Sequence, residues 1–243
     1  MESKLRTIIV GDIHSCLDEF VELLKVLSYN KETDRLILAG DLTDRGPFPI
    51  EVVRKVREMD VECCCGNHDI KILKWWKNKG SRGDVNHKPA YYEQLSDDDI
   101  NFIAQMSPYI KIEEQNTIIV HAGLRPGIPL EKQTKDDLYY IRYMDEDQKF
   151  ISLRKINSLG SKEAAGAHFW TEYGPFGYDI VYGHNVHSLT DIRIDKYDDG
   201  TACYGIDTGA CFGGKLSALI LETKEIVQVQ AKREYYKSNF SIR

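Results

Sequence analysis

The chain has 243 residues, of which 42% are hydrophobic and 29% charged, a balance typical of globular domains that excludes disorder as the dominant state. The formal net charge of −6 argues against a nucleic-acid-binding protein that depends on a basic surface. It does not argue against a small anionic substrate, because a bound metal can reverse the field locally. The length and the lack of repeats or low-complexity linkers favour one domain over residues 1–243.

The first ten residues carry too short an apolar run for a signal peptide, and no stretch approaches the ~18 apolar residues of a membrane span. We therefore expect a cytoplasmic protein without membrane contact and without a stable nucleic-acid complex. Three of the six cysteines, residues 63–65, are consecutive, and no C-x-x-C pair occurs. The cysteines are therefore predicted to be small core residues rather than disulfide partners or metal ligands.

Short apolar runs rich in β-forming residues recur along the chain and predict strands. They cover residues 5–10, 36–39, 61–65, 117–120, 180–182, 202–206, 217–221 and 225–229. Helical patterns cover residues 18–27 and 50–59, and Ser96 followed by three aspartates predicts the start of another helix. The first half is thus typical of a parallel α/β fold, the second half is richer in strands, and residues 78–92 and 144–167 are expected to be irregular insertions.

Polar residues that carry chemistry follow five of these strands directly. They are Asp12 and His14, then Asp41, Asp44 and Arg45, then Asn67 and His68, then His121, and then His184. Each piece alone is weak evidence, because an aspartate at a turn often bonds its own backbone. Five pieces in order, each after a strand, predict a ligand site at the edge where open α/β sheets bind their ligands.

The residue types in this set indicate metal binding. Imidazole and oxygen ligands without thiolates suit Mn²⁺, Fe, Zn²⁺ or Ni²⁺ in an open site rather than a structural zinc site, and we favour Mn²⁺. Six ligands are too many for one ion that keeps an open position. They fit two divalent ions that share a bridging carboxylate at a separation of about 3.5–4 Å.

With these residues the chain resembles the phosphoprotein-phosphatase branch of the calcineurin-like metallophosphoesterases. The matching segments are GDIH (11–14), GDLTDRG (40–46), GNHD (66–69), HAGL (121–124) and YGH (182–184). The resemblance implies an α/β fold, a four-layer α/β/β/α sandwich with a small cap insertion near a two-metal active site.

The resemblance also implies a role for each matching residue. Asp12, His14 and Asp41 would hold one metal, and Asp41, Asn67, His121 and His184 would hold the other. His68 would be the general acid, oriented by Asp44, while Arg45 and Asn67 would contact the substrate phosphate.

General chemistry supports this division of labour. Two metals lower the pKa of a shared water and so supply a hydroxide nucleophile, and they neutralise the phosphoryl oxygens during attack. A histidine that titrates near neutrality can protonate the leaving oxygen, and a carboxylate bonded to it fixes its tautomer. An arginine fork matches phosphate oxygens, although Arg45 could instead form an ordinary turn-stabilising ion pair.

Three positions depart from the family pattern without removing a ligand. Ser15 stands where Gly is usual and could crowd the first metal loop. Asp69 stands where the protein phosphatases of this branch mostly carry Glu. Asn185 and Val186 follow His184, where bacterial relatives often have Thr and Pro.

The resemblance in residues 206–216 and in the segment around Arg142 is to bacterial small phosphatases and symmetrical diadenosine tetraphosphate hydrolases. Arg142 is therefore a second candidate phosphate ligand, with a helix-surface arginine as the alternative. Asp207 could support a metal-ligand histidine from behind. Aromatic residues in or near the insertions could stack a base or simply pack the cap. These are Tyr139, Tyr140, Tyr143, Trp170, Tyr173, Phe176 and Tyr178.

Three functions follow as hypotheses. The leading one is a metal-dependent phosphohydrolase that cleaves diadenosine tetraphosphate by attack of metal-bound hydroxide. The alternative is a phosphoprotein phosphatase that acts on Ser and Thr, with or without Tyr, in phosphopeptides. A third is an inactive binding module, against which the intact ligand set argues. The basic, aromatic tail from Lys232 to Arg243 is expected to be a docked or frayed terminus.

Overall fold

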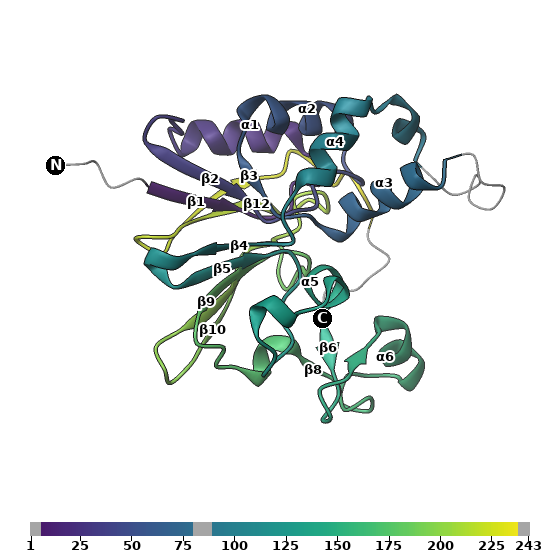
Figure 1. Ribbon diagram of the computed structural model, residues 1–243, viewed down its shortest axis with the longest axis vertical. Coiled ribbons are helices and arrows are strands. Elements are labelled where there is room, and N and C mark those ends of the chain that lie inside the picture. Colours follow the sequence, from purple (N-terminus) through teal and green to yellow (C-terminus); the bar gives the residue numbers. More distant parts are fainter. Residues whose placement is uncertain (1–5, 80–88, 238–243) are drawn as a thin grey trace.

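Two five-stranded sheets lie face to face in the computed structural model, which describes residues 6–79 and 89–237 (Figure 1). The first sheet has the order β13 (Glu225–Gln230), β12 (Lys215–Ile220), β1 (Arg6–Val10), β2 (Asp34–Leu38) and β3 (Glu62–Cys63). The second has the order β10 (Arg193–Lys196), β11 (Ala202–Gly205), β9 (Asp179–Tyr182), β5 (Thr117–Val120) and β4 (Tyr109–Ile112). The expected mixed α/β sandwich is confirmed.

Parallel strands form the centre of both sheets and antiparallel strands complete them. In the first sheet β1, β2 and β3 run parallel, while β12 and β13 are antiparallel additions. In the second sheet β5, β9 and β11 run parallel, and β4 and β10 pair antiparallel at the two edges. The carboxyl ends of the parallel strands therefore carry the loops that open α/β sheets use for binding.

The helical patterns at residues 18–27 and 50–59 and the predicted helix start at Ser96 correspond to three of the α-helices in the described ranges. The α-helices in these ranges are α1 (Leu17–Val26), α2 (Pro49–Met59), α3 (Asn67–Lys77), α4 (Asp97–Gln105), α5 (Lys135–Tyr140) and α6 (Leu153–Leu159). Short 3₁₀ turns cover Ala90–Gln94, Glu113–Gln115, Leu130–Lys132 and Trp170–Tyr173. As expected, Ser96 caps α4 by accepting a hydrogen bond from the backbone N–H of Asp99. None of the helices in the described ranges has both the length and the apolar character needed to cross a bilayer.

Alternation along the strands divides the core into layers. In β1, Ile8 and Val10 face the cluster that contains Phe20 and Leu23 of α1, while Ile9 faces the second sheet. Burial of apolar side chains on both faces of a strand fits a parallel strand covered by helices on one side and by a sheet on the other. Figure 1 shows α1 and α2 on the outer side of the first sheet.

The segment expected to be an irregular insertion at 144–167 is in fact partly ordered as secondary structure. A small sheet of β7 (Phe150–Ile151), β6 (Tyr143–Met144) and β8 (His168–Phe169) forms there, and α6 packs on it through Ile156. Strands of two residues carry no period that sequence analysis could detect, which explains the error. Of the other expected insertion, 78–92, residues 80–88 lie outside the described ranges, and Ala90–Gln94 is a 3₁₀ turn.

All six cysteines are buried and free, as predicted for small core residues. Cys63 lies in the core under the helices, Cys64 between the sheets and Cys65 on the far side of the second sheet. Burial raises the pKa of the Cys203 thiol to about 12, so the thiol stays protonated at neutral pH. The cysteines thus contribute packing.

Candidate metal centre and active site

Five loops, each following a strand, bring the expected metal ligands to one place. The loops leave β1, β2 and β3 of the first sheet and β5 and β9 of the second. Six side chains from these loops are buried: Asp12, His14, Asp41, Asn67, His121 and His184. Their convergence from five separate segments is what a metal centre requires and what a set of independent turns would not produce.

Several residues in these loops have a left-handed backbone conformation that residues other than glycine rarely adopt. Positive φ angles occur at His14 (44°), Ser15 (61°), Asp41 (49°), Asp44 (68°), Arg45 (67°) and His184 (65°). A non-glycine residue with positive φ costs of order 1 kcal/mol or more, and such residues cluster at functional sites. The surrounding hydrogen bonds compensate, since the backbone N–H groups of His14 and Ser15 donate to the carbonyls of Asp41 and Leu42 at 2.9 and 2.8 Å.

Two glycines let the loops approach the ligand carboxylates closely. A Cβ at Gly66 would collide with Oδ1 of Asp41, and a Cβ at Gly183 would collide with Oδ1 of Asp12. The absence of a side chain leaves room for backbone N–H groups to contact the carboxylates. His68 donates to Asp41 at 2.8 Å and His184 donates to Asp12 at 3.0 Å. Both carboxylates are therefore oriented by backbone donors.

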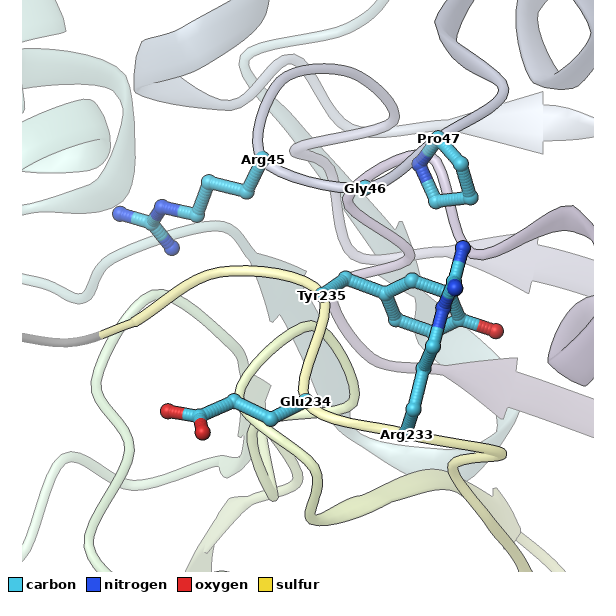
Figure 2. Close-up of a pocket in the computed structure, with 6 residues that line it drawn as sticks. All are labelled: Arg45, Gly46, Pro47, Arg233, Glu234 and Tyr235. Atoms are coloured by element: carbon cyan, nitrogen blue, oxygen red, sulfur yellow. The ribbon is translucent and has the colours of Figure 1, made fainter.

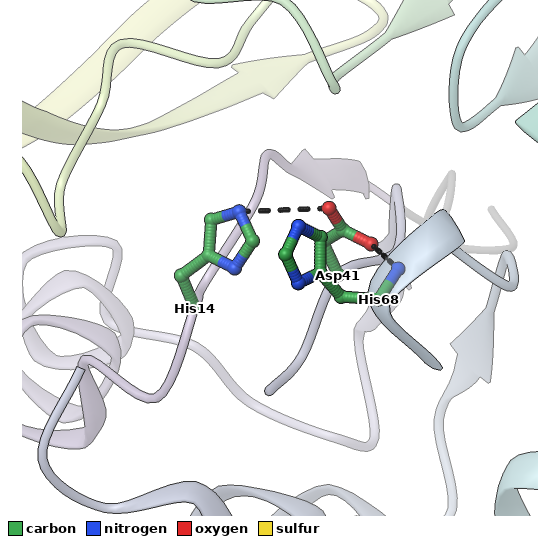
Figure 3. A group of neighbouring side chains, drawn as sticks. All are labelled: His14, Asp41 and His68. Atoms are coloured by element: carbon green, nitrogen blue, oxygen red, sulfur yellow. Dashed lines mark hydrogen bonds and ion pairs between the residues drawn. The ribbon is translucent and has the colours of Figure 1, made fainter. Parts of the chain in front are cut away.

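One half of the centre is the group of His14, Asp41 and His68, shown in Figure 3. Nδ1 of His14 donates to the carbonyl of Thr43 at 2.8 Å, so Nε2 carries the lone pair. That Nε2 lies 3.5 Å from Oδ2 of Asp41 and 3.8 Å from Oδ2 of Asp12. A lone pair and two carboxylates thus face one another.

The other half is built around His121. Its Nδ1 donates to the carbonyl of Ala39 at 3.1 Å, which leaves the lone pair on Nε2. That Nε2 lies 3.1 Å from Oδ1 of Asn67, 3.1 Å from Nδ1 of His184 and 3.5 Å from Oδ2 of Asp41. Asp41 therefore faces both halves, the position of a bridging ligand.

The side-chain atoms that meet here are suited to bind divalent cations but not to bond to one another. Nε2 of His121 and the oxygens of Asn67 and Asp41 are all acceptors, which repel unless a positive charge lies among them. Nδ1 of His184, 3.1 Å from Nε2 of His121, faces this group as well and accepts from the Arg142 guanidinium at 3.5 Å. Unpaired acceptors of this kind are costly in a protein interior, and metal coordination is a standard way to satisfy them.

The electrostatics of the ligands agree with that fit. Burial lowers the pKa of His14, His121 and His184, so the imidazoles are neutral and able to donate a lone pair. Burial opposes the ionisation of Asp41, but the surrounding imidazoles, His121 first, hold its pKa below the ordinary value. Burial and then the charge of Asp207 raise the pKa of Asp12, a penalty that a nearby cation would offset.

His68 is oriented by a carboxylate, as the sequence resemblance implied. Its Nδ1 lies 2.5 Å from Oδ2 of Asp44, which leaves Nε2 for proton transfer. The hydroxyl of Tyr91 donates to the other oxygen of Asp44 at 2.6 Å. Sequence analysis missed Tyr91, because it lies in a segment with no recognisable motif.

Arg45 lies between the histidines of the site. One nitrogen of its guanidinium donates to Nε2 of His14 at 2.5 Å and another lies 3.1 Å from Nε2 of His68. The face of the guanidinium stacks over Phe212 with a distance of 5.1 Å to the ring centre. No carboxylate pairs with Arg45 among the ion pairs of the described residues, so the simple turn-stabilising ion pair is not its role.

The tail after β13 borders this arginine and is docked rather than frayed. Backbone N–H groups of Tyr235 and Tyr236 donate to the carbonyl of Cys211 at 3.0 and 2.9 Å. A hollow of about 280 Å³ separates the tail from the loop that follows Arg45 (Figure 2). It is lined by Arg45, Gly46, Pro47, Arg233, Glu234 and Tyr235. Of the expected tail, residues 238–243 lie outside the described ranges.

Arg142 reaches the site from the loop after α5. Its guanidinium donates to Oδ1 of Asn185 at 2.5 Å and lies 3.5 Å from Nδ1 of His184. Burial lowers its pKa, and the charge of Asp207 opposes that effect. Asn185, one of the departures from the family pattern, thus positions the arginine. A helix-surface arginine does not describe this environment.

Asp207 is buried behind the ligands. One of its oxygens accepts from the backbone N–H of Gly209 at 3.0 Å, and the other has no partner. Burial raises its pKa to about 6. No hydrogen bond to a ligand histidine is present among the described residues, so its expected support of a histidine is not seen in these contacts.

The other departures are accommodated locally. Ser15 is fully buried at a positive φ, and its hydroxyl has no hydrogen-bond partner. Asp69 accepts from the backbone N–H groups of Gly66 and Leu42, at 2.9 and 3.2 Å, and so joins two ligand loops. The shorter aspartate therefore serves as a loop brace.

The cap aromatics are used mainly for packing. Tyr139, Tyr143 and Trp170 are at most 6% exposed and belong to one apolar cluster with Phe169. The remaining four pack against that cluster while partly exposed: Tyr140, Tyr173, Phe176 and Tyr178. A nearby open hollow of about 270 Å³ is lined mostly by polar side chains, Glu146, His168 and Glu172 with Tyr173. These contacts favour the packing role that was one of the two expected for the cap aromatics.

Comparisons with known proteins agree with this geometry. Residues 5–213 match the family described as calcineurin-like phosphoesterase. An asymmetrical bis(5'-nucleosyl)-tetraphosphatase of Bacillus cereus (strain Q1) is 29% identical, covering 96% of this chain and 97% of that protein. A symmetrical bis(5'-nucleosyl)-tetraphosphatase of Salmonella arizonae is 26% identical, covering 95% and 96%.

Solved structures show the same architecture. One of a candidate diadenosine tetraphosphatase superposes with a TM-score of 0.78 at 25% identity, over 95% of both chains. A serine/threonine phosphatase from Saccharomyces cerevisiae superposes with a TM-score of 0.59 at 12% identity, over 96% of this chain and 81% of that one, which shows the fold alone. The family match, the two-sheet fold and the buried His and Asp cluster together show that the chain belongs to the calcineurin-like phosphoesterase family and is a metal-dependent phosphohydrolase.

Proposed function

We propose that this enzyme hydrolyses a phosphoanhydride bond of bis(5'-nucleosyl) tetraphosphates, with diadenosine tetraphosphate as its substrate. The observation that carries the chemistry is the buried cluster in which Asp41 faces His14 on one side and His121 on the other. The similarity to bis(5'-nucleosyl)-tetraphosphatases over nearly the whole chain supports the choice of substrate.

Two divalent ions, with Mn²⁺ preferred, would be held by the converging side chains. Asp12, His14 and Asp41 would hold one ion, and Asp41, Asn67, His121 and His184 would hold the other. When bound, such ions supply an activated water and neutralise charge on the phosphoryl oxygens. The imidazole and oxygen donors, without thiolates, support this class of metal.

The protein's own residues would do the rest of the work. The guanidiniums of Arg45 and Arg142, with the amide of Asn67, would bind and orient the phosphoryl group that is attacked. Nε2 of His68 would carry the proton for the leaving oxygen, while Asp44 keeps Nδ1 occupied. The intact set of these groups argues against an inactive binding module.

A substrate comparison with purified protein and Mn²⁺ tests the proposal. We expect diadenosine tetraphosphate to be converted to nucleotides, separated by chromatography. Two ADP would indicate symmetrical cleavage, and ATP with AMP would indicate asymmetrical cleavage. Phosphate release from phosphopeptides, with no nucleotide released from the dinucleotide, would contradict the proposal and identify a phosphoprotein phosphatase.

A further inference from the structure

A lysine that no motif includes lies against the proposed general acid. Nζ of Lys71 is 3.3 Å from both ring nitrogens of His68. The two residues are three apart in the first turns of α3, so their side chains lie on the same face of the helix. The position of Lys71 is therefore fixed by the same helix that positions His68.

The ammonium group is not neutralised by an ion pair. Among the ion pairs of residues 6–79 and 89–237, none includes Lys71. Asp44 is the acid bonded to His68, and both of its oxygens are already used, one by His68 and one by Tyr91. The Arg45 guanidinium also lies against His68, so two cationic side chains lie next to each other here. Two neighbouring cations attract an anion.

Because Lys71 lies beside His68, we can infer which part of a bound substrate it would contact. A general acid must lie next to the leaving oxygen to protonate it. The group that flanks the general acid therefore flanks the leaving group as well. Arg142, in contrast, contacts His184 and Asn185 on the other half of the site.

The leaving groups of the two candidate substrate classes differ in charge next to the bond that is cleaved. In a phosphoanhydride the leaving group is itself a nucleotide whose first phosphate carries negative oxygens. In a phosphoserine peptide the leaving group is an uncharged alcohol. In either case water adds to phosphorus and releases one proton to the solvent, and the bond from phosphorus to the leaving oxygen breaks. That oxygen keeps the electron pair of the broken bond and takes a proton from Nε2 of His68.

We propose that Lys71 binds the phosphate of the leaving nucleotide and so makes the enzyme prefer phosphoanhydrides over phosphomonoesters of uncharged alcohols. This inference rests on the proposed function. Lys71 transfers no proton in this step and acts as a specificity-determining binding group. One helical turn further along the same face, Nζ of Lys74 lies 3.3 Å from the hydroxyl of Tyr140, which continues the positive edge of α3.

The test compares Lys71→Met and Lys71→Arg with the wild type, on diadenosine tetraphosphate and on nitrophenyl phosphate. Lys77→Met removes the same charge from the last turn of α3, six residues or about 9 Å along the helix, and serves as the control. The readout is the ratio of kcat/KM for the dinucleotide to kcat/KM for the ester.

We expect Lys71→Met to lower that ratio ~10- to 100-fold, mainly through KM, because a charge-assisted hydrogen bond to the substrate is lost. Lys71→Arg should restore most of it and Lys77→Met should leave it unchanged. An unchanged ratio in Lys71→Met, with active wild type on the dinucleotide, would overturn this inference alone. A wild type that releases no nucleotide would overturn the proposed function and the inference with it.

Discussion

The edge that carries the ligand loops and the cap formed by residues 143–173 are built on opposite principles. At the ligand edge, residues such as Asp41 and His184 keep positive φ angles, and acceptors such as Nε2 of His121 and Oδ2 of Asp41 are buried facing one another. In the cap, Phe169 and Trp170 are buried in an apolar cluster, as in an ordinary core. Non-glycine residues with positive φ are concentrated in the ligand loops, where they position the site, whereas the large buried apolar side chains of the cap contribute stability.

The largest expected effect is at the bridging position. Asp41→Asn removes the charge that faces both halves of the centre, so we expect the second metal to be lost and turnover to fall to background. Metal content per chain, measured by mass spectrometry, checks this. A variant that still holds two metals per chain would contradict the bridging role.

The next largest effect is expected at His68, the proposed general acid. His68→Asn should keep the metals and lower kcat by ~10²–10⁴-fold, which is the usual contribution of a positioned acid. The loss should be greatest for alkyl phosphates, whose leaving groups need a proton most. Equal losses on nitrophenyl and alkyl phosphates would show that His68 is not the acid.

A substitution in the cap should lower stability without affecting metal binding. Phe169→Ala removes a buried ring and should lower the free energy of unfolding by about 3–5 kcal/mol, as a large cavity in a core does. Metal content at low temperature should stay unchanged. Denaturant unfolding measures the stability, and a metal assay measures the metal content. Loss of metal from folded Phe169→Ala would show that the cap also supports the metal centre, which would contradict the comparison.

The smallest effect is expected at Tyr91, which supports Asp44 from outside the set of proposed metal ligands. Burial opposes ionisation of Asp44, but hydrogen bonds from His68 and Tyr91 hold its pKa below the ordinary value. Tyr91→Phe removes one of these bonds, so the pKa of Asp44 should rise. Since Asp44 must be ionised to orient His68, the acid limb of the kcat/KM profile should move to higher pH, with a loss of less than ~10-fold at neutral pH. A profile that does not move would exclude Tyr91 from this role.

The parts predictable from sequence are those with a local signal. The strand at 117–120 was predicted with the bounds that the structure shows, because a run of β-branched residues is bounded by turns. The strands Tyr109–Ile112 and Arg193–Lys196 were missed, since both are half-exposed edge strands, and charged residues interrupt their apolar pattern. Edge pairing depends on the neighbouring strand more than on local sequence.

The same contrast holds within the site. Motifs at strand ends indicated the ligand residues, because the carboxyl ends of parallel strands meet in space. Tyr91 and Lys71 carried no such signal. Their importance comes from contacts with Asp44 and His68 that only the folded chain creates.

The central claim is that two divalent ions, held by this one cluster, make the enzyme active. The most direct measurement is a Mn²⁺ titration of chelator-treated protein, with bound metal and hydrolysis of diadenosine tetraphosphate followed in the same samples. The account predicts no turnover without metal, two bound ions per chain at saturation, and activity that rises with the second. Full activity with one ion per chain, or in excess chelator, would contradict it.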